Sequence, residues 1–330
     1  MTNSASERPG EFALIAELFA PLADAPGAFG LTDDAAIVTP PAGHDLVATT
    51  DALVEGVHFF AGDPADLIAK KALRVSLSDL AAKGCAPAGY LLALSLPARI
   101  EMSWLRAFAG GLHDDQRAFG VSLLGGDTTT TPGPVTIAIT AFGHVPAGAM
   151  LRRTGARPGD IVFVSGTIGD SGGGLVCLKD GGAALQEHHR AFLVGRFQVP
   201  QPRIALGHAL LGLASASIDV SDGLIADLGH IAETSGVRID VEAERLPLSA
   251  ALASVWPDRM DRIVRAATAG DDYEIAFTAP PEHGDAVLGL ATSAGVPITQ
   301  IGLATAGEGA VLLDANRRQI PIDRPGYVHF

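Results

Sequence analysis

The sequence predicts a layered α/β fold, of the α+β type, divided into two domains. Strand-like and helix-like segments alternate along the chain, a pattern typical of sheets covered by helices. Hydrophobic residues occupy 48% of the 330 positions and charged residues only 18%, so the chain can bury a core large enough for two domains. The stretch "TGARPGD" at 154–160 breaks the alternation. We therefore expect one domain over residues 1–150 and a second over 151–330.

The first domain is expected to hold one sheet and two long helices, after a short amphipathic helix near the N-terminus. Apolar runs predict strands at 45–50, 89–96, 121–126 and 135–145, and 3.6-residue periodicity predicts helices at 64–84 and 103–119.

The second domain is expected to open with a strand, "IVFVSG", and a glycine-rich turn, "GTIGDSGGG". A short strand is expected to end at Asp219. The other expected elements are helices at 171–180, 187–197, 203–214 and 222–235, and strands at 238–243, 273–279, 298–304 and 310–314.

Composition excludes several classes of function. A formal net charge of −14 disfavours direct binding to nucleic acid or to an anionic membrane. No apolar stretch is long enough to span a bilayer, and the N-terminus lacks the pattern of a signal peptide, so we expect a soluble cytoplasmic protein. Cys85 and Cys177 form neither a disulfide framework nor a CxxC metal site, and we expect two small buried side chains.

Aspartates recur beside short apolar runs, where surface acids are not expected. We predict that each lies at the end of a strand or on a buried face of a helix. These residues are Asp33 and Asp34, Asp51, Asp79, Asp127, and Asp219 with Asp222.

Asp79 illustrates the pattern. On the predicted helix 64–84, the apolar stripe through Ile68, Ala72 and Val75 continues onto Asp79. A buried carboxylate has to be paired, hydrogen-bonded or bound to a metal. The alternatives to a metal are local backbone N–H groups or a partially exposed position for Asp79.

Asp51 and Asp127 each stand beside threonines. Thr49 and Thr50 precede Asp51, and a run of four threonines follows Asp127. Each acid alone would also fit a turn. Two carboxylates about 4 Å apart repel by about 4 kcal/mol at an effective dielectric of 20, so at neutral pH a cluster of them requires either cations or raised pKa values. Oxygen ligands favour Mg²⁺, Mn²⁺ or Ca²⁺, and the sequence therefore predicts a metal-bridged polyphosphate site.

The usual phosphate-binding signatures are absent from the sequence, including GxxxxGK[ST] and GxGxxG. The turn "GTIGDSGGG" fits either a backbone cradle for phosphate or a tight strand-to-helix connection. Arg152 and Arg153 fit either a phosphate clamp or surface cations near a linker. Asp222 alone would fit a helix N-cap, but Asp219, at a strand end, would not.

Together these motifs amount to a resemblance. The chain resembles the thiamine-monophosphate kinases, a family in the superfamily typified by aminoimidazole ribonucleotide synthetase. The resemblance covers about residues 10–330, and its motifs occur in the family's order: "GEFALI", "GLTDDAA", "TTDALVEGVHF", "SLSDLAAKG", "LLGGDTT", "RRTGARPGD", "IDVSDGLIADLGHI", "AGDDYEI" and "GYVHF".

The resemblance implies a reaction and an assembly. Members of the family transfer the γ-phosphoryl group of ATP directly to thiamine monophosphate with several Mg²⁺ ions, as the last step of thiamine diphosphate synthesis. The family's fold has an N-terminal mixed sheet with helices, which pairs with its counterpart across a homodimer, and a C-terminal α/β domain. The ATP site lies in a cleft between the domains.

The resemblance also assigns residues to roles. Metal ligands fall on Asp34, Thr49, Thr50, Asp51, Asp79, Asp127, Asp219 and Asp222, with Asp33 as a further candidate; ATP contacts fall on Gly126, Asp127, Arg153 and Ser221; and thiamine phosphate contacts fall on His58, Asp271 and Tyr327. Where the family reads "GGEDYEL", this chain has "AGDDYEI", so Asp271 replaces a glutamate.

Two other functions fit parts of the sequence. A sister enzyme, such as a selenophosphate synthetase or an aminoimidazole ribonucleotide synthetase, would share the fold. The first of these has a reactive Cys or selenocysteine near its N-terminus, whereas the first cysteine here is Cys85, and the second does not match "VEGVHF" or "GYVHF". A non-catalytic module holding Ca²⁺ is the other, although no EF-hand spacing is present.

Overall fold

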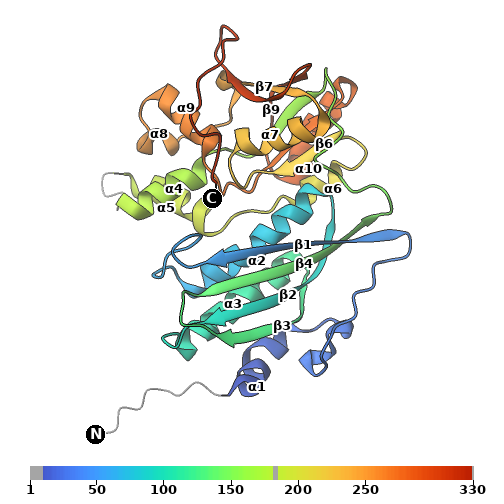
Figure 1. Cartoon of the computed structure of the whole chain (residues 1–330), viewed down its shortest axis with the longest axis vertical. Helices are drawn as coiled ribbons and strands as arrows, with labels where there is room; N and C mark the ends of the chain where they lie inside the picture. The colour runs from blue at the N-terminus through green and yellow to red at the C-terminus, as the bar shows by residue number, and fades with distance from the viewer. Residues whose placement is uncertain (1–9, 181–184, 329–330) are drawn as a thin grey trace. The chain divides into compact units, whose positions relative to one another are not determined.

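A computed structural model describes residues 10–180 and 185–328, and the chain forms two compact units (Figure 1). Unit 1 contains Met1–Leu80 and Ala86–Ala147, and unit 2 contains Ala81–Cys85 and Gly148–Phe330. The grouping of Ala81–Cys85 with the second unit was not predicted. Over the described residues, no helix has both the length and the apolar character needed to cross a membrane.

Unit 1 is built around a four-stranded mixed sheet with the order β1-β4-β2-β3. Strands β2 and β3 are parallel and are joined by helix α3, whereas β4 is antiparallel to both β1 and β2. The elements are α1 (Glu11–Leu14), β1 (His44–Val54), α2 (Ala65–Ala82), β2 (Ala86–Leu96), α3 (Met102–Phe119), β3 (Ser122–Thr130) and β4 (Thr136–Pro146), with short helical turns at Ile15–Phe19, Ala20–Leu22 and Pro26–Leu31.

Strands β1 and β3 extend further than the sequence predicted. Asp51 and Asp127 were expected at strand ends, and that expectation was wrong, because both lie inside strands. Thr128, Thr129 and Thr130 continue β3 past Asp127, because branched side chains favour extended backbone, and Ala52, Leu53 and Val54 continue β1 past Asp51. Both acids are therefore held by a regular hydrogen-bonded ladder.

Unit 2 contains a six-stranded sheet with the order β10-β7-β9-β5-β8-β6. Only β10 and β7 pair in parallel among these neighbours. Its strands are β5 (Ile161–Ser165), β6 (Ala216–Asp219), β7 (Arg238–Glu242), β8 (Ile275–Ala279), β9 (Ile298–Thr305) and β10 (Gly309–Leu313). Its helices are α4 (Asp170–Asp180), α5 (Glu187–Gln198), α6 (Ile204–Ala209), α7 (Leu224–Ser235), α8 (Leu252–Val255), α9 (Arg259–Thr268) and α10 (Gly284–Ala294), with 3₁₀ turns at Ala243–Arg245 and Pro281–His283.

Each face of this sheet carries its own apolar core. Along β5, Val162 and Val164 belong to the core shared with α4, α5, α7 and α9. Phe163 points the other way, into the core shared with α6 and α10, and its ring stacks on Phe277 at a centroid distance of 5.3 Å. Alternate residues of one strand therefore contribute apolar side chains to both cores. The predicted α/β fold is confirmed.

Most helices lie where the sequence predicted them, but α8, α9 and α10 were missed and α6 is shorter than expected. In α9 only Ile263, Ala266 and Ala267 are buried, so its apolar stripe is thin beside its charged residues. Cys85 and Cys177 are free and buried, as predicted.

A buried ion pair joins the two long helices of unit 1. Arg74 of α2 donates from Nε to Asp115 Oδ2 at 2.7 Å and from Nη2 to Oδ1 at 2.8 Å. Asp115 is 1% exposed, whereas Asp114 beside it is 63% exposed and meets Lys70 at 2.9 Å. The same two helices thus carry one buried pair and one exposed pair.

We predict that Asp115→Asn lowers the free energy of unfolding of unit 1 by about 3 kcal/mol, because it leaves a buried guanidinium without its counter-ion. The matched change Asp114→Asn should cost less than about 1 kcal/mol. Urea titrations followed by Trp104 fluorescence, in a Trp256→Phe background, measure both. Equal losses for the two variants would contradict the prediction.

Candidate functional site

The register of the unit 1 sheet places the predicted ligands on two opposite faces. Asp51 pairs with Ile139, which is buried. Ala52, the next residue of β1, belongs to the row that crosses β4 and β2 and ends at Asp127. Since successive residues of a strand point to opposite faces, Asp51 and Asp127 lie on different sides of the sheet.

On the side of α2, two acids lie close together with hydroxyl partners. Asp79 accepts a short hydrogen bond from Thr49 Oγ1. Asp51 accepts one from Ser76 Oγ at 2.8 Å. Burial, reinforced by the charge of Asp79, raises the pKa of Asp51 to about 6, against the opposing effect of the Ser76 hydroxyl. This repulsion between two half-buried carboxylates is what a bound cation would relieve.

On the other face, a pocket of about 770 Å³ carries a second group of acids, a volume typical of ligand sites. Glu11, Asp33, Asp34 and Asp127 contribute its charge, and its apolar lining includes Leu91 and Phe142. Asp33 and Asp34 were expected at a strand end or on a buried helix face. That was wrong, because both are exposed on an irregular segment, where Asp33 Oδ1 accepts the Asp34 N–H at 2.8 Å.

The side chains of Thr49 and Thr50 point to opposite faces of the sheet, because successive residues of a strand alternate between its faces. Thr50 Oγ1 accepts a hydrogen bond from Thr140 at 3.1 Å, and Thr140 lines the pocket. The structure therefore groups the Thr49 hydroxyl with Asp51 and Asp79, and the Thr50 hydroxyl with the pocket. Gly126 also lines the pocket, but a Cβ there would lie 1.9 Å from the Leu92 carbonyl oxygen, so strand packing alone requires glycine.

In unit 2, antiparallel pairing of β6 with β8 brings two predicted motifs together. Asp219, 5% exposed, ends β6 and pairs with Ile275 at the start of β8. The loop after Asp219 therefore runs beside the loop before Ile275. Their backbones are bonded from the Asp271 N–H to the Ser221 oxygen and from the Tyr273 N–H to the Val220 oxygen, both at 2.8 Å.

The C-terminal tail joins the same loop. The Tyr327 N–H donates to the Asp222 oxygen at 2.8 Å. Gly326 approaches so closely that a Cβ would lie 2.6 Å from that oxygen. Ser221, Asp222, Asp271 and Tyr327 were predicted from three separate motifs, and backbone contacts now hold them side by side.

Asp271 has a strained backbone. Its φ is +68° and that of Tyr273 is +51°, conformations that non-glycine residues rarely adopt. The Tyr273 hydroxyl donates to Asp271 Oδ1 at 3.2 Å. Such strain is common in ligand-binding loops.

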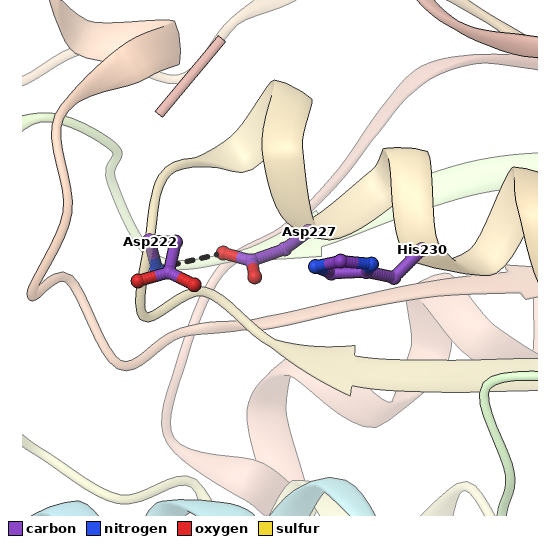
Figure 2. Close-up of side chains that lie close together, drawn as sticks. All are labelled: Asp222, Asp227 and His230. Carbon is purple, nitrogen blue, oxygen red and sulfur yellow. Dashed lines mark hydrogen bonds between the residues drawn. The ribbon is translucent and has the colours of Figure 1, made fainter. Parts of the chain in front are cut away.

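Sequence reasoning missed Asp227, which lies in the first turn of α7 and bonds to this loop. Figure 2 shows its carboxylate between Asp222 and His230, and the three residues offer ligand atoms within 4.8 Å of one another. Asp227 is 2% exposed, and burial, together with the charge of Asp222, raises its pKa to about 7. A signal was present, because Asp227 shares the apolar stripe of α7 with Leu224 and Ile231.

The helix-cap alternative for Asp222 was wrong. The N-cap of α7 is Gly223, with no side-chain cap bond. Asp227 instead accepts the N–H groups of Ser221, Asp222 and Gly223, at 3.0, 3.1 and 3.1 Å. The side chain of Asp222 is therefore not needed for capping.

The glycine-rich turn after β5 supports the tight-connection alternative. Asp272, fully buried, accepts the N–H groups of Gly169 and Ser171 at 2.6 and 3.2 Å, and burial raises the pKa of Asp272 well above its usual range. A Cβ at Gly166 would strike the Glu274 carboxylate at 2.2 Å. Two backbone N–H groups that could hold phosphate, those of Gly169 and Ser171, are thus bonded to the protein's own acid.

Glu274 anchors the same loop from inside unit 2. Its carboxylate is buried and accepts from Arg196 Nη2 at 2.8 Å, Arg203 Nε at 2.7 Å and Ser165 Oγ at 2.6 Å. Two cations and a hydroxyl satisfy this charge. The "DDYE" segment therefore combines two buried anchors, Asp272 and Glu274, with the less buried Asp271.

His58 and Arg153 have local contacts that do not test their predicted roles. His58 Nδ1 accepts the Val54 N–H at 3.0 Å in the turn after β1. Arg153 and its neighbour Arg152 are exposed, and the Arg153 carbonyl accepts from Ser235 Oγ at 3.4 Å.

The donor atoms suit a hard divalent cation. The predicted ligands offer carboxylate and hydroxyl oxygens, which Mg²⁺ and Ca²⁺ prefer, and Asp51 and Asp79 are close enough for their charges to repel. The residues that would hold Mg²⁺ are Thr49, Asp51 and Asp79; Asp33, Asp34, Thr50 and Asp127; and Asp219 and Asp222.

Comparison with known proteins now places the chain in a family. Residues 32–145 match AIR synthase related protein, N-terminal domain, and residues 157–314 match the C-terminal domain of the same description. The thiamine-monophosphate kinase of Caulobacter vibrioides is 42% identical, over 98% of this chain and 92% of its own length. The chain belongs to the thiamine-monophosphate kinase family.

Solved structures of the family agree. The thiamine-monophosphate kinase of Stenotrophomonas maltophilia has a TM-score of 0.80 and 43% identity, covering 86% of this chain and 89% of its own. AaThiL complexed with AMPPCP and TMP has a TM-score of 0.78 and 32% identity, covering 92% of this chain and 97% of its own. The resemblance inferred from the motifs is confirmed.

We predict that Mg²⁺ alone raises the melting temperature of the wild-type protein by at least about 2 °C, because an ion that binds only the folded state stabilises it. Asp79→Asn should remove most of this gain. Without metal, the same variant should be at least as stable as wild type, because it relieves repulsion with Asp51.

Differential scanning fluorimetry with and without Mg²⁺ measures both effects, with Asp114→Asn as the control at an exposed acid. An Mg²⁺ response in Asp79→Asn equal to that of wild type would contradict the assignment of Asp79 as a ligand.

Proposed function

We propose that this chain phosphorylates thiamine monophosphate with ATP, giving thiamine diphosphate and ADP as the last step of thiamine diphosphate synthesis. The carrying observation is that the fold gathers acids and hydroxyls, the preferred ligands of Mg²⁺, in one group at Thr49, Asp51 and Asp79 and in a second group at the pocket. Asp219 and Asp222 lie at the two ends of one short loop in unit 2.

Family membership supports this reading over the alternatives. AaThiL, which aligns over 92% of this chain, was solved with AMPPCP and TMP. Relatives named as thiamine-monophosphate kinases match at 40 to 42% identity over nearly the whole chain. These matches favour the kinase over a sister enzyme and over a module that only binds Ca²⁺.

In the proposed reaction, a terminal phosphate oxygen of thiamine monophosphate attacks the γ-phosphorus of ATP in line. A bond forms between that oxygen and phosphorus as the bond from phosphorus to the β,γ-bridging oxygen breaks, and ADP leaves. The attacking oxygen is already ionised near neutral pH, since the second pKa of a phosphate monoester is about 6. No side chain has to serve as a general base.

The contribution of the protein is then position and charge. Gly126, Asp127, Arg153 and Ser221 are proposed to bind ATP. His58, Asp271 and Tyr327 are proposed to orient thiamine monophosphate. Asp271 is one methylene shorter than the family's glutamate, and its bond from the Tyr273 hydroxyl holds it in place. Mg²⁺ ions, when bound by the acids, would neutralise the facing phosphates.

We also propose that the protein works as a homodimer in the cytoplasm, with the unit 1 sheets facing each other. The face of the sheet opposite α2 exposes Leu46 at 42%, with Ala48 and Ala52 exposed along the same strand. These three apolar side chains are suited to burial against an identical face, whereas Thr50, which lies between Ala48 and Ala52 on the same face, belongs to the pocket group.

The kinase proposal is tested by incubating purified protein with ATP, Mg²⁺ and thiamine monophosphate and measuring thiamine diphosphate by chromatography. We expect Asp127→Asn and Asp219→Asn each to lower turnover by about 10²-fold or more, because each removes charge that offsets that of the phosphates.

Asp285→Asn, at an exposed position of α10, is the matched control and should keep wild-type turnover. Thiamine in place of thiamine monophosphate should give no product, because it lacks the attacking phosphate. Absence of thiamine diphosphate with folded wild-type protein would refute the proposal.

The dimer proposal predicts a mass in solution of about twice the 33.8 kDa of the chain, measured by light scattering after gel filtration. Leu46→Asp should shift the protein toward the monomer, because it places charge in the apolar contact. Leu288→Asp, at a residue with a similar exposure of 44% on α10, should not. Equal behaviour of the two variants would argue against this interface.

A further inference from the structure

The loop between β6 and α7 has nearly all of its backbone bonded to groups outside it. Its three N–H groups at Ser221, Asp222 and Gly223 converge on one atom, Asp227 Oδ2, at 3.0 to 3.1 Å. The Val220 N–H donates to the Glu274 oxygen at 2.8 Å. The conformation of this loop therefore depends on the side chain of Asp227, which lies beyond the loop in the first turn of α7.

The carbonyl groups of the same loop accept hydrogen bonds from the residues proposed to contact thiamine monophosphate. Ser221 accepts from the Asp271 N–H, and Asp222 accepts from the Tyr327 N–H, both at 2.8 Å. The loop that carries proposed metal and ATP ligands thus also holds Asp271 and Tyr327, which are proposed to contact thiamine monophosphate. A shift of the loop would move both sets of residues together.

We infer that Asp227 is a positioning residue for the phosphoryl transfer, which sets the Val220–Gly223 loop and, through its carbonyls, aligns the ATP and acceptor contacts. This role rests on the proposed function. Asp227 is buried and is not assigned any contact with substrate. Its side chain acts through the backbone it holds.

The hydrogen bonds that Asp227 accepts have a second consequence. Three N–H groups at the start of a helix would otherwise form a site for a phosphate group. With Asp227 bonded to them, the backbone N–H groups of residues 221–223 are not free to bind phosphate, and the loop carries the carboxylates of Asp219 and Asp222 instead. Asp227 thereby makes the loop select a cation rather than a bare anion.

The variants Asp227→Asn and Asp227→Ala separate the two parts of this role. Asparagine keeps one oxygen that can accept N–H bonds but loses the charge that strengthens them. Alanine leaves three N–H groups without their acceptor. The loss should therefore be graded, with wild type above asparagine and asparagine above alanine.

Asp160→Asn is the matched control. Asp160 is also buried in unit 2, at 5% exposure, and it also holds backbone, accepting the Arg157 N–H at 3.0 Å and Ser215 Oγ at 2.6 Å. It has no bond to the 220–223 loop among those seen for the described residues. A purely structural role for Asp227 would make the two asparagine variants behave alike.

The test is steady-state kinetics on the full-length chain with ATP, thiamine monophosphate and Mg²⁺ varied in turn. For Asp227→Asn we expect the KM of both substrates and the half-saturating Mg²⁺ concentration to rise by about 10-fold. For Asp227→Ala we expect kcat/KM to fall by about 10²-fold or more, because small misplacements of the reacting groups lower the rate by factors of this size. Asp160→Asn should keep all three constants within about 2-fold of wild type, a margin that separates it from those losses.

Hydrogen exchange of the peptide spanning residues 219–228 supplies a readout that needs no activity. Exchange at 221–223 should rise in both Asp227 variants and stay at the wild-type level in Asp160→Asn. Unchanged exchange in both Asp227 variants, or kinetic constants that match those of the control, would overturn the inference. A loss in His230→Ala as large as that in Asp227→Asn would overturn it in favour of direct cation binding by the Asp222, Asp227 and His230 group.

These outcomes differ from failure of the proposed function. A folded wild-type protein that makes no thiamine diphosphate refutes the kinase proposal itself. An active wild type with insensitive Asp227 variants refutes only the positioning role.

Discussion

A carboxylate removed from water has to be satisfied by hydrogen bonds or by a cation. Within each unit, the local structure around every buried acid depends on which of these partners it has. Asp227 and Asp272 accept backbone N–H groups, and Glu274 meets two arginines. Asp51 and Asp79 instead have hydroxyl partners and each other's charge. The first kind holds the fold together, whereas the second kind is suited to receive a metal ion.

This division explains how a strongly acidic chain can serve a reaction between phosphates. Helices α4 and α7 both begin at turns whose N–H groups are bonded to an internal carboxylate. Neither turn then offers those groups to phosphate, as a glycine-rich phosphate loop does. Under the proposed function, the affinity for phosphate comes from cations held by the remaining acids, which accounts for the absence of a P-loop.

Sheet pairing determines which motifs cooperate. The antiparallel contact of β6 with β8 brings "IDVSDG" beside "AGDDYE", and the C-terminal tail closes on the same loop through Tyr327. In unit 1, strand alternation divides neighbouring residues, so that Thr49 and Asp51 lie with α2 while Thr50 lies with the pocket.

The sequence by itself determined the α/β class, the positions of most strands and helices, and the family, because these rest on local periodicity and on motifs that can be read in order. Asp79 and Asp219 were recognisable as unusual acids from their apolar neighbours alone. Only the tertiary structure decided that Asp227 and Asp272 hold backbone, that Thr49 and Thr50 separate, and that Tyr327 meets Asp222. The partner of a carboxylate is set by strand pairing and chain return, which join residues far apart in sequence and leave no local pattern.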